Sequence, residues 1–528
     1  MYQNHFGKAT RFAFTALGLL AVGYSHAQIS LTGQLRTRTE VRNGLGNLQT
    51  KGAQSAVFTS QRTRINFGYK WDRLTFGAAL QDVRVWGQDA SSITNNDGAR
   101  LMLHEGWADL TLANKADTTI AFKWIDQLSL KVGRQELVYD DARLIGNLDW
   151  LQQARRHDMA LLKAMHHGWQ IEAGYAFNQN TDAFGVASTA YAPGNVPAYV
   201  KNSIGVLVPV AAGFVPLVNA AGNSTSNGNP SYTNPPSTNG ANQDYKSFTT
   251  AYISRKFNQT KVALLFFNDN FGKSHLDSIS VGGGMLYGKR YAAANAADTR
   301  NYSGYNSRFT YGGMITHTIG NASGFGKIAL QGAFYKQTGS DRDGKNLNAF
   351  HLNLQATYQK GKFSITPGID ILSGNDSSLT NTSANTNRFD PLYGTPHKFW
   401  GYMDYFYVGT GSPTGGLADP YFKIKYTSNM LTIGADYHYF TTHKAMKGTD
   451  GKFLGSEIDL QLNYNMNKFT NIELGYSLMF ASKNMPIAKA QVTTLTAAEN
   501  YNRTGTWFYA MLKFTPDFFY AKPVAIKQ

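Results

Sequence analysis

The sequence predicts an all-β protein, a transmembrane antiparallel β-barrel of about eighteen strands with short periplasmic turns and long extracellular loops. Three observations lead to this fold class: an export signal at the N-terminus, a composition rich in aromatic residues and poor in charge, and apolar residues that alternate along many segments. The domain organisation that follows is a signal peptide at residues 1–27 and one outer-membrane barrel at residues 28–528.

The N-terminus has the three parts of a secretory signal. Lys8 and Arg11 precede an apolar run over residues 12–22, and Ser25 and Ala27 supply the small residues that a signal peptidase reads. The alternative is a membrane anchor, but the run is shorter than the ~20 apolar residues that a spanning helix needs. We therefore expect the mature chain to begin at Gln28 and the protein to lie in a bacterial outer membrane.

The composition narrows the class of the exported chain. There is no cysteine in 528 residues, which excludes disulfides, thiol chemistry and thiolate metal sites. Aromatic residues make up 13% of the chain and charged residues 16%, against about 25% charged residues in typical soluble domains. No apolar segment after the signal is long enough for a spanning helix. An outer-membrane barrel fits these features, and a large secreted β-solenoid or sandwich is the competing class.

Alternation favours the barrel. Over residues 29–42, apolar and small residues such as Leu31 and Leu35 occupy one face and polar residues such as Arg36 the other. Residues 454–464 and 472–480 repeat the pattern, as do 350–358, 363–371 and 431–439. These faces run for ~10 residues, the length of a tilted membrane-crossing strand. Strands of soluble sandwiches are shorter, with a mode near ~5–6 residues.

Short polar turns and long links connect the predicted strands. The predicted turns are Asp72-Arg73, His166-His167-Gly168, Asn258-Gln259, Gly361-Lys362, Ser428-Asn429 and Asn467-Lys468. The long links, rich in Gly, Asn, Ser and Thr, cover residues 178–243, 270–305, 374–416 and 483–501. A barrel of ~16–18 strands leaves an aqueous channel. The pattern does not account for the residues after Phe514.

The polar faces of the strands should point into the lumen, because a charged side chain facing lipid costs ~2–4 kcal/mol at the midplane. The mature chain keeps a formal charge of +14, since the signal removes Lys8 and Arg11 from a total of +16. Such an excess would draw anions into the lumen, whereas the alternative is a ladder of cross-strand ion pairs that stabilises the wall. The residues placed in the lumen by alternation are Arg36, Arg38, Arg62, Arg64, Lys423 and Lys425, together with Arg84, whose phase is ambiguous near Leu80.

A second group of charges is concentrated in residues 131–158, around a predicted link between two strands. Arginine binds carboxylates through two parallel hydrogen bonds, and the same geometry would hold a uronate. The alternative is a folded link that is pinned by Arg–Asp pairs. The candidate pore residues of this group are Lys131, Arg134, Glu136, Arg143, Arg155 and Asp158.

Four stretches resemble the alginate-export family of outer-membrane porins. They are GRQELVYDDARLIGNLDWLQQARRHD (133–158), LSGND (372–376), RFDPLYGTPHKFWGYMDYF (388–406) and LGSEIDLQLNYN (454–465). The resemblance implies a monomeric barrel of eighteen strands with an arginine-lined, electropositive pore that exports an anionic polysaccharide. By this analogy, the conduit residues are Arg36, Arg62, Arg134, Arg143 and Arg155, whereas Lys423 and Lys425 rest on alternation alone.

Other chemistry finds little support in the sequence. Residues 283–289 resemble a phosphate loop, but Arg290 stands where Ser or Thr is required. His166-His167 lacks the further ligands of a metal site. Basic residues alternate through strands rather than gather with aromatic residues, which argues against nucleic acid. We expect no cofactor, no metal and no enzymatic activity.

Three functions remain open at this stage. The first is a channel for anionic solutes or an anionic polysaccharide, and the second is a general diffusion porin with a weak anion preference. The third is an outer-membrane enzyme or receptor that uses the barrel as a scaffold. The expected partners are outer-membrane lipid and lipopolysaccharide, the anionic solute and periplasmic export proteins.

Overall fold

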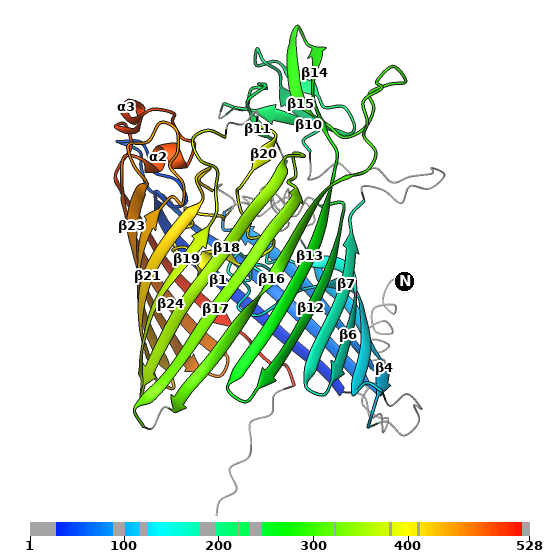
Figure 1. The fold of residues 1–528 in the computed structure, drawn as a ribbon, viewed down its shortest axis with the longest axis vertical. Helices are drawn as coiled ribbons and strands as arrows, with labels where there is room; N and C mark the ends of the chain where they lie inside the picture. The colour runs from blue at the N-terminus through cyan, green and yellow to red at the C-terminus, as the bar shows by residue number, and fades with distance from the viewer. Residues whose placement is uncertain are drawn as a thin grey trace, which may run out of the picture.

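The computed structural model describes residues 28–87, 101–116, 124–179, 196–219, 221–231, 245–321, 324–379, 383–408 and 412–519. Nineteen strands pair into one sheet, and all but the two-residue β20 (Asn385–Thr386) form a closed ring of eighteen antiparallel strands. The ring closes because β1 (Gln28–Asn43) pairs with β25 (Thr504–Phe514) as well as with β2 (Ala56–Trp71). The predicted fold class is confirmed (Figure 1).

Each strand of the ring pairs with its neighbours along the chain. The remaining strands are β3 (Leu74–Val85), β4 (Met102–Asn114), β5 (Gln127–Gln135), β6 (His157–His166), β7 (Trp169–Phe177), β12 (Ser247–Phe257), β13 (Thr260–Gly272), β16 (Tyr305–Asn321), β17 (Gly326–Ser340), β18 (Asn346–Lys360), β19 (Phe363–Leu372), β21 (Leu417–Thr427), β22 (Leu431–Thr441), β23 (Phe453–Asn467) and β24 (Thr470–Ala481).

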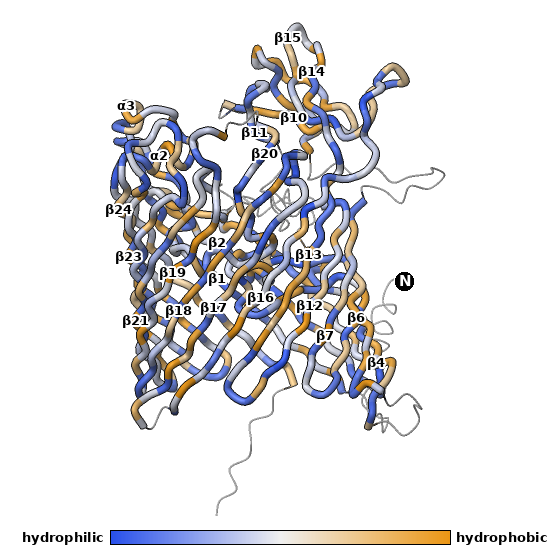
Figure 2. Tube along the Cα trace, viewed as in Figure 1, coloured by the Kyte–Doolittle hydropathy of each residue, from blue (hydrophilic) through white to orange (hydrophobic). Residues whose placement is uncertain are grey.

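Side chains alternate between the lipid-facing and the lumenal side of the wall. On β1, Leu35 is 37% exposed, whereas the next residue, Arg36, is 3% exposed. Because directly paired residues share a face of the sheet, Arg62 on β2, opposite Arg36, also faces the lumen. Figure 2 shows apolar residues recurring along the strands between more polar ends.

The short turns lie at one end of the barrel and most long links at the other (Figure 1). Each of the six predicted turns joins two neighbouring strands of the ring. β1 begins at the turn end and β25 finishes there. The chain then continues along β1, because Gly33 N–H donates to Pro516 O at 2.8 Å and Phe518 N–H donates to Leu31 O at 3.0 Å. The residues after Phe514, up to 518, thus extend the seam of the barrel.

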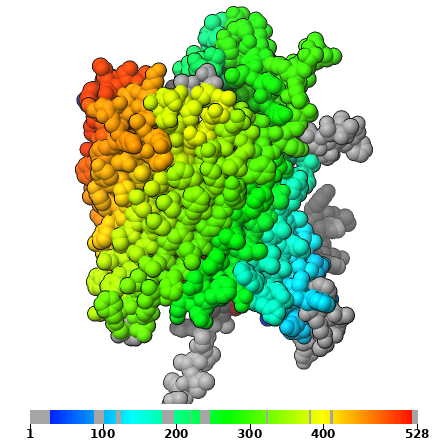
Figure 3. All heavy atoms as spheres, viewed as in Figure 1, coloured from blue at the N-terminus to red at the C-terminus, as the bar shows by residue number. Residues whose placement is uncertain are grey.

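A cap of small elements stands at the loop end (Figures 1 and 3). The described parts of the links after β7 and β13 form a sheet of β10 (Phe214–Val218), β11 (Asn229–Pro230), β14 (His275–Val281) and β15 (Gly284–Arg290), and a pair of β8 (Tyr199–Lys201) and β9 (Leu207–Pro209). The link after β24 contains the helices α2 (Met485–Ala488) and α3 (Leu495–Ala498).

The N-terminal signal predicted at residues 1–27 lies outside the described residues, and β1 begins at the predicted start of the mature chain, Gln28. Among the described helices, none has the length and apolar character needed to cross a bilayer.

Candidate functional site in the barrel lumen

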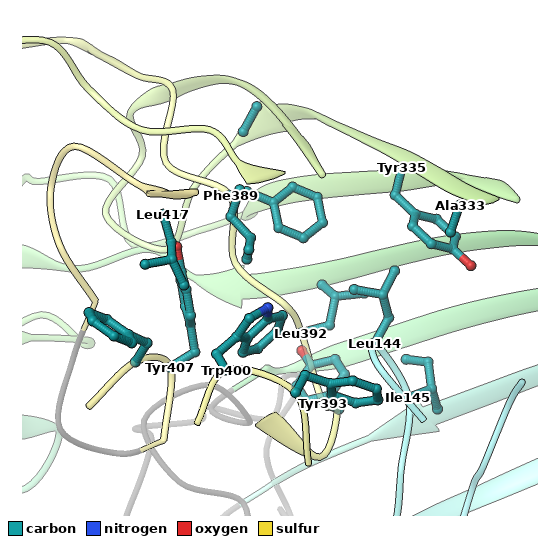
Figure 4. Close-up of a cluster of buried hydrophobic side chains, with 14 of the residues drawn as sticks. Leu144, Ile145, Ala333, Tyr335, Phe389, Leu392, Tyr393, Trp400, Tyr407 and Leu417 are labelled. Carbon is teal, nitrogen blue, oxygen red and sulfur yellow. The ribbon is translucent and has the colours of Figure 1, made fainter. Parts of the chain in front are cut away.

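Two links fold into the lumen and bind each other there. We call residues 136–156 the first lumenal segment and residues 388–407 the second. Gly146 N–H donates to Tyr393 O at 3.0 Å, and Tyr393 N–H donates to Leu144 O at 2.9 Å. Figure 4 shows Ile145 and Leu144 of the first segment beside Tyr393 and Leu392 of the second. Two stretches that lie far apart in the sequence thus form one structure inside the barrel.

Arginines on β1 and β2 hold the first lumenal segment by its carbonyl groups. Arg36 donates to Asp149 O at 2.8 Å and to Leu151 O at 3.1 Å, and Arg38 donates to Trp150 O at 2.9 Å. Arg62 donates to Gln152 O at 3.3 Å. The three arginines are 3%, 4% and 0% exposed. They face the lumen as predicted, but the segment covers them, so they do not present free charge to a solute.

Asp149 neutralises part of this arginine group. Its carboxylate accepts from Arg62 at 2.7 Å and lies 3.4 Å from Arg36 and 4.0 Å from Arg64. Burial opposes ionisation of Asp149, but the positive charges of Arg62, Arg36 and Arg64 outweigh it and hold the pKa of the carboxyl below its usual value. The carboxylate is therefore charged at neutral pH.

Carboxylates on the opposite wall hold the second lumenal segment by its N–H groups. Met403 N–H donates to Glu457 Oε1 at 2.8 Å, and Tyr402 N–H donates to Asp459 Oδ2 at 3.2 Å. Both acidic side chains lie on β23, face the lumen and are buried. Gly401 makes the close approach feasible, because a Cβ at this position would lie 2.6 Å from Glu457 Oε1. The wall thus offers donors to one segment and acceptors to the other.

Arg143 and Arg155 also lie buried in the lumen. Arg143 Nη1 donates to Asp370 Oδ2 of β19 at 2.6 Å, and Arg143 Nε donates to Asp141 at 3.2 Å. Burial opposes the charge on Arg143, but Asp370 and Asp141 raise its pKa above the usual value. Arg155 Nη1 donates to Gly394 O at 2.5 Å, and burial lowers its pKa to about 10. These arginines join the two segments to each other and to the wall.

An aromatic stack completes the junction. Trp150 lies parallel to His397, with ring centroids 4.2 Å apart, and the guanidinium of Arg38 lies 4.3 Å from the Trp150 ring. Trp507 of β25 meets Trp150 edge-on at 5.8 Å. Cation–π and aromatic contacts of this kind each contribute about 0.5–2 kcal/mol. The stack therefore helps to fix both segments against the seam of the barrel.

Three lysines lie within electrostatic reach of one another in the lumen, and we call Lys398, Lys423 and Lys425 the lysine cluster. Lys398 and Lys425 are exposed, whereas Lys423 is half-buried. Lys398 ends the 3-10 helix η1 (Pro396–Lys398) of the second segment, and the other two face the lumen from β21. The side chain of Lys398 is exposed, although neighbouring residues surround part of it. Burial lowers the pKa of Lys398; Asp141 partly offsets this effect, and the charges of Arg143, Lys423 and Lys425 add to it.

The rest of the predicted pore set lies on the lumenal side of β2 to β5. Lys131 Nζ lies 3.8 Å from the Trp107 ring centroid. Arg64 lies 3.8 Å from Glu136, which also contacts His104 at 3.0 Å. The charges of this wall are therefore partly balanced by nearby carboxylates.

The structure corrects three placements. Arg84 lies on the outward face, because the preceding residue, Val83, is paired with the lumenal Arg62. Asp158 also lies on the outward face, because the preceding residue, His157, is buried on the lumenal side. Arg134 is paired with Asp158 and therefore shares that face. Arg84 pairs with Asp82 at 2.7 Å, and Arg134 pairs with Asp158 through two contacts of 2.8 Å. These pairs lie near the loop ends of their strands, where mutual neutralisation lowers the cost of an outward charge.

Sequence reasoning did not assign Lys398, Glu457 or Asp459 to the site. All three belong to stretches that carried the family resemblance, but that resemblance names motifs and not contacts. The alternation of residues 454–464 could have placed Glu457 and Asp459 in the lumen, whereas nothing local indicates that residues 388–407 fold inward. Among the described side chains, no group of three or more His, Cys, Asp or Glu could hold a metal ion.

Comparison with known proteins gives one family match. The family model described as alginate export matches residues 27–177, which cover β1 to β7 and the first lumenal segment. The second lumenal segment lies outside the matched residues. No curated protein matches the sequence.

Solved structures share the fold at low identity. OpdO of Pseudomonas aeruginosa is 10% identical with a TM-score of 0.53, over 93% of this chain and 98% of that one. OccK9 (OpdG) of Pseudomonas aeruginosa is 11% identical with a TM-score of 0.52, over 93% and 99%. OccAB4 of Acinetobacter baumannii is 11% identical with a TM-score of 0.52, over 93% and 98%. The chain thus has the fold of bacterial outer-membrane porins, and residues 27–177 are similar to the alginate-export family.

Proposed function

We propose that this protein is an outer-membrane channel for anionic solutes, including an anionic polysaccharide, and that the lysine cluster selects them. The observation that carries the proposal is the contrast between covered and exposed cations. The arginines of β1 and β2 are used to bind the first lumenal segment, whereas Lys398 and Lys425 are exposed. No ion pair is found for Lys425 among the described residues, and Lys423 pairs with Asp436 at 2.8 Å.

The lysine cluster differs from a structural ion-pair ladder in its charge balance. The Lys398 ammonium donates to the backbone carbonyl of Asp141 at 3.2 Å and lies 5.5 Å from the Phe399 ring centroid, and no carboxylate pairs with it among the described residues. A cluster of three lysines with one direct carboxylate partner keeps an excess of positive charge. In a confined lumen, such an excess raises the local concentration of anions and repels cations.

A general diffusion porin with a weak anion preference is the main alternative. The family match at residues 27–177 favours a channel for a defined class of solute. An enzyme or receptor is less well supported, because the matches are to an export family and to a porin fold.

Ion selectivity tests the proposal. The purified barrel is placed in a planar bilayer under a salt gradient, and the reversal potential gives the anion-to-cation permeability ratio. Replacing the cluster (Lys398→Gln, Lys423→Gln, Lys425→Gln) should lower that ratio by about threefold or more, because three charges leave one confined site. The control removes the same charge from the loops (Lys51→Gln, Lys444→Gln, Lys447→Gln) and should leave the ratio close to that of the wild type.

Addition of oligouronate distinguishes a channel for an anionic polysaccharide from a general diffusion porin. Block of the wild-type current by oligouronate, but not by a neutral oligosaccharide, supports passage of an anionic polysaccharide. Anion selectivity without such block leaves the general porin. Cation selectivity in the wild type contradicts the proposal.

Three further expectations belong to this function. Cleavage after Ala27 would release the chain at Gln28, where β1 begins. We also propose that the barrel acts as a monomer in contact with lipopolysaccharide. Transfer of a polymer through it would need periplasmic export partners at the turn end.

A further inference from the structure

Four lysines line the lumen at the turn end of the barrel. Each occupies the second position from the turn end of its strand, and we call them the mouth ring: Lys70 of β2, Lys256 of β12, Lys327 of β17 and Lys513 of β25. These strands are spread around the wall, so the mouth ring surrounds the turn-end opening of the barrel (Figure 1).

Alternation along the strands points the mouth ring inward. Each lysine lies an even number of positions from a buried lumenal residue of its own strand, and the pairing register is continuous in between; these residues are Arg62, Tyr252, Tyr335 and Tyr509. Lys70 and Lys256 are exposed, whereas Lys327 and Lys513 are half-buried. The four ammonium groups therefore belong to the lumenal side and not to the lipid-facing side.

The mouth ring has no carboxylate partners among the described residues. The residues directly opposite its lysines are neutral or basic, namely Gln28, Arg36, Thr75, Lys261, Gly320, Gln359 and Asn471. Lys256 stands opposite Lys261, whose own ammonium pairs with Asp140 at 2.8 Å. Like charges placed directly opposite each other are unfavourable, so the wall keeps positive charge here at a cost to its stability.

Acidic side chains that face the lumen near this end offset the ring only in part. Asp109 pairs with Lys163. Glu172 and Glu473 are 8% and 9% exposed, and they accept from the hydroxyls of Tyr139 at 2.9 Å and Tyr509 at 2.8 Å. Covered carboxylates on one side and exposed lysines on the other leave an excess of positive charge at the mouth.

The spacing of the mouth ring favours a chain of charges over a single one. Lys70 and Lys513 are separated by β1, which places their strands ~10 Å apart, and Lys256 and Lys327 are separated by β13 and β16, or ~14 Å. One carboxylate cannot contact lysines at such separations. A polymer with a carboxylate on each unit can contact several at once, and each further contact is then intramolecular.

We propose that the mouth ring is a second binding site of the lumen, which takes a polyanionic chain such as a uronate polymer from the periplasmic side. Rings of lysine or arginine favour anions in pores, and a mouth of one sign of charge raises the arrival rate of an oppositely charged ligand. Lys425 of the lysine cluster is third from the turn end of β21, so the two groups of cations adjoin. The site rests on the proposed function for the class of its ligand.

Blocking of single channels from a known end tests the site. A galacturonate octamer is added to one compartment of a planar bilayer, and the rate of blocking events is recorded. The chain has no cysteine, so biotin can be attached at Ala445→Cys, an exposed position of the link after β22. Streptavidin bound to this biotin cannot cross the bilayer and keeps the loop end in the compartment of addition.

Loss of the mouth ring should slow block from the turn end alone. The variant Lys70→Gln, Lys256→Gln, Lys327→Gln, Lys513→Gln should lower the turn-end blocking rate by about tenfold, because charges at a mouth act on the arrival rate. The loop-end rate should stay close to that of the wild type, which also shows that the variant barrel is intact. Replacement of the same four lysines by arginine should keep the turn-end rate.

Two controls limit the effect to these positions and to a polymer. The matched variant removes four exposed lysines from the loop side (Lys51→Gln, Lys201→Gln, Lys444→Gln, Lys447→Gln) and should keep the turn-end rate. Monomeric galacturonate should show little dependence on the mouth ring, because it cannot contact two lysines.

The outcomes that overturn the mouth ring are an unchanged turn-end rate, an equal loss at both ends, an equal loss for the monomer, or no block by the octamer from either end. The proposed function is read separately, from the reversal potential and the lysine-cluster variant. Cation selectivity together with block that depends on the ring contradicts the proposed function alone. Anion selectivity that depends on the cluster, without block that depends on the ring, contradicts the second site alone.

Discussion

The ion pair between Arg143 and Asp370 provides the sharpest test of how the lumenal segments are held. The two side chains are 4% and 1% exposed, and they meet at 2.6 Å between the first segment and β19. The substitution Asp370→Asn removes the negative charge and keeps the size of the side chain. Arg143 is then left buried with Asp141, at 3.2 Å, as its remaining acidic partner.

The expected cost follows from the burial of the pair. Removing one partner of a buried ion pair typically costs about 3–5 kcal/mol of unfolding free energy. Because Asp141 still compensates part of the charge of Arg143, we expect a value near the lower end, about 3 kcal/mol. The double variant Arg143→Met, Asp370→Asn leaves no unpaired charge at this pair and should be less destabilised than the sum of the single variants, with a coupling energy of about 2 kcal/mol.

The assay is reversible urea unfolding in phospholipid vesicles, followed by tryptophan fluorescence for the wild type, both single variants and the double variant. Glu499→Gln is the control, because its carboxylate is 62% exposed and forms a surface pair with Arg503 at 2.9 Å. Such a pair should contribute about 0.5 kcal/mol or less. A loss in Asp370→Asn no larger than in this control, or strict additivity of the single variants, would refute the reasoning.

Two further predictions concern the same junction. Gly394→Ala should displace the second lumenal segment and raise the conductance, because a Cβ at this position would lie 2.0 Å from Arg143 O. Gly451→Ala is the control and should leave the conductance unchanged, because a Cβ there would have no atom within 4 Å. Asp149 has a lowered pKa, so its contribution to stability is present above pH ~4 and is lost as the pH falls through the folded-state value. Asp149→Asn should therefore be less stable than the wild type at pH 7 in urea titrations and show a smaller further loss below pH 4; equal losses would contradict this assignment.

The strands of the barrel wall could be predicted because their residue pattern depends only on neighbouring positions in the sequence. A strand with lipid on one side and polar surroundings on the other must alternate with period two, and residues 29–42 show the alternation directly. The polar turns are equally local, since Gly361-Lys362 and Asn258-Gln259 each join neighbouring strands. The strand order follows from these two features alone.

The site could be predicted only in part, because its contacts are not local. Alternation placed Arg36 and Arg62 in the lumen, but only the fold shows that carbonyls of residues 149–152 cover them. The same reasoning failed for Arg84, whose outward charge is tolerated because Asp82 is its neighbour on that face. Lys398 was missed because the inward path of residues 388–407 depends on acceptors that β23 supplies.

The junction of the two lumenal segments has a consequence for the order of folding. The hydrogen bond from Leu148 N to Thr395 Oγ1 spans 247 positions of the chain. Contacts between such distant residues form late, because the loop between them must be closed first. Here that loop contains eight complete strands of the wall, β6, β7, β12, β13 and β16 to β19. A barrel whose wall is assembled and whose interior is still unfilled is therefore the expected last intermediate.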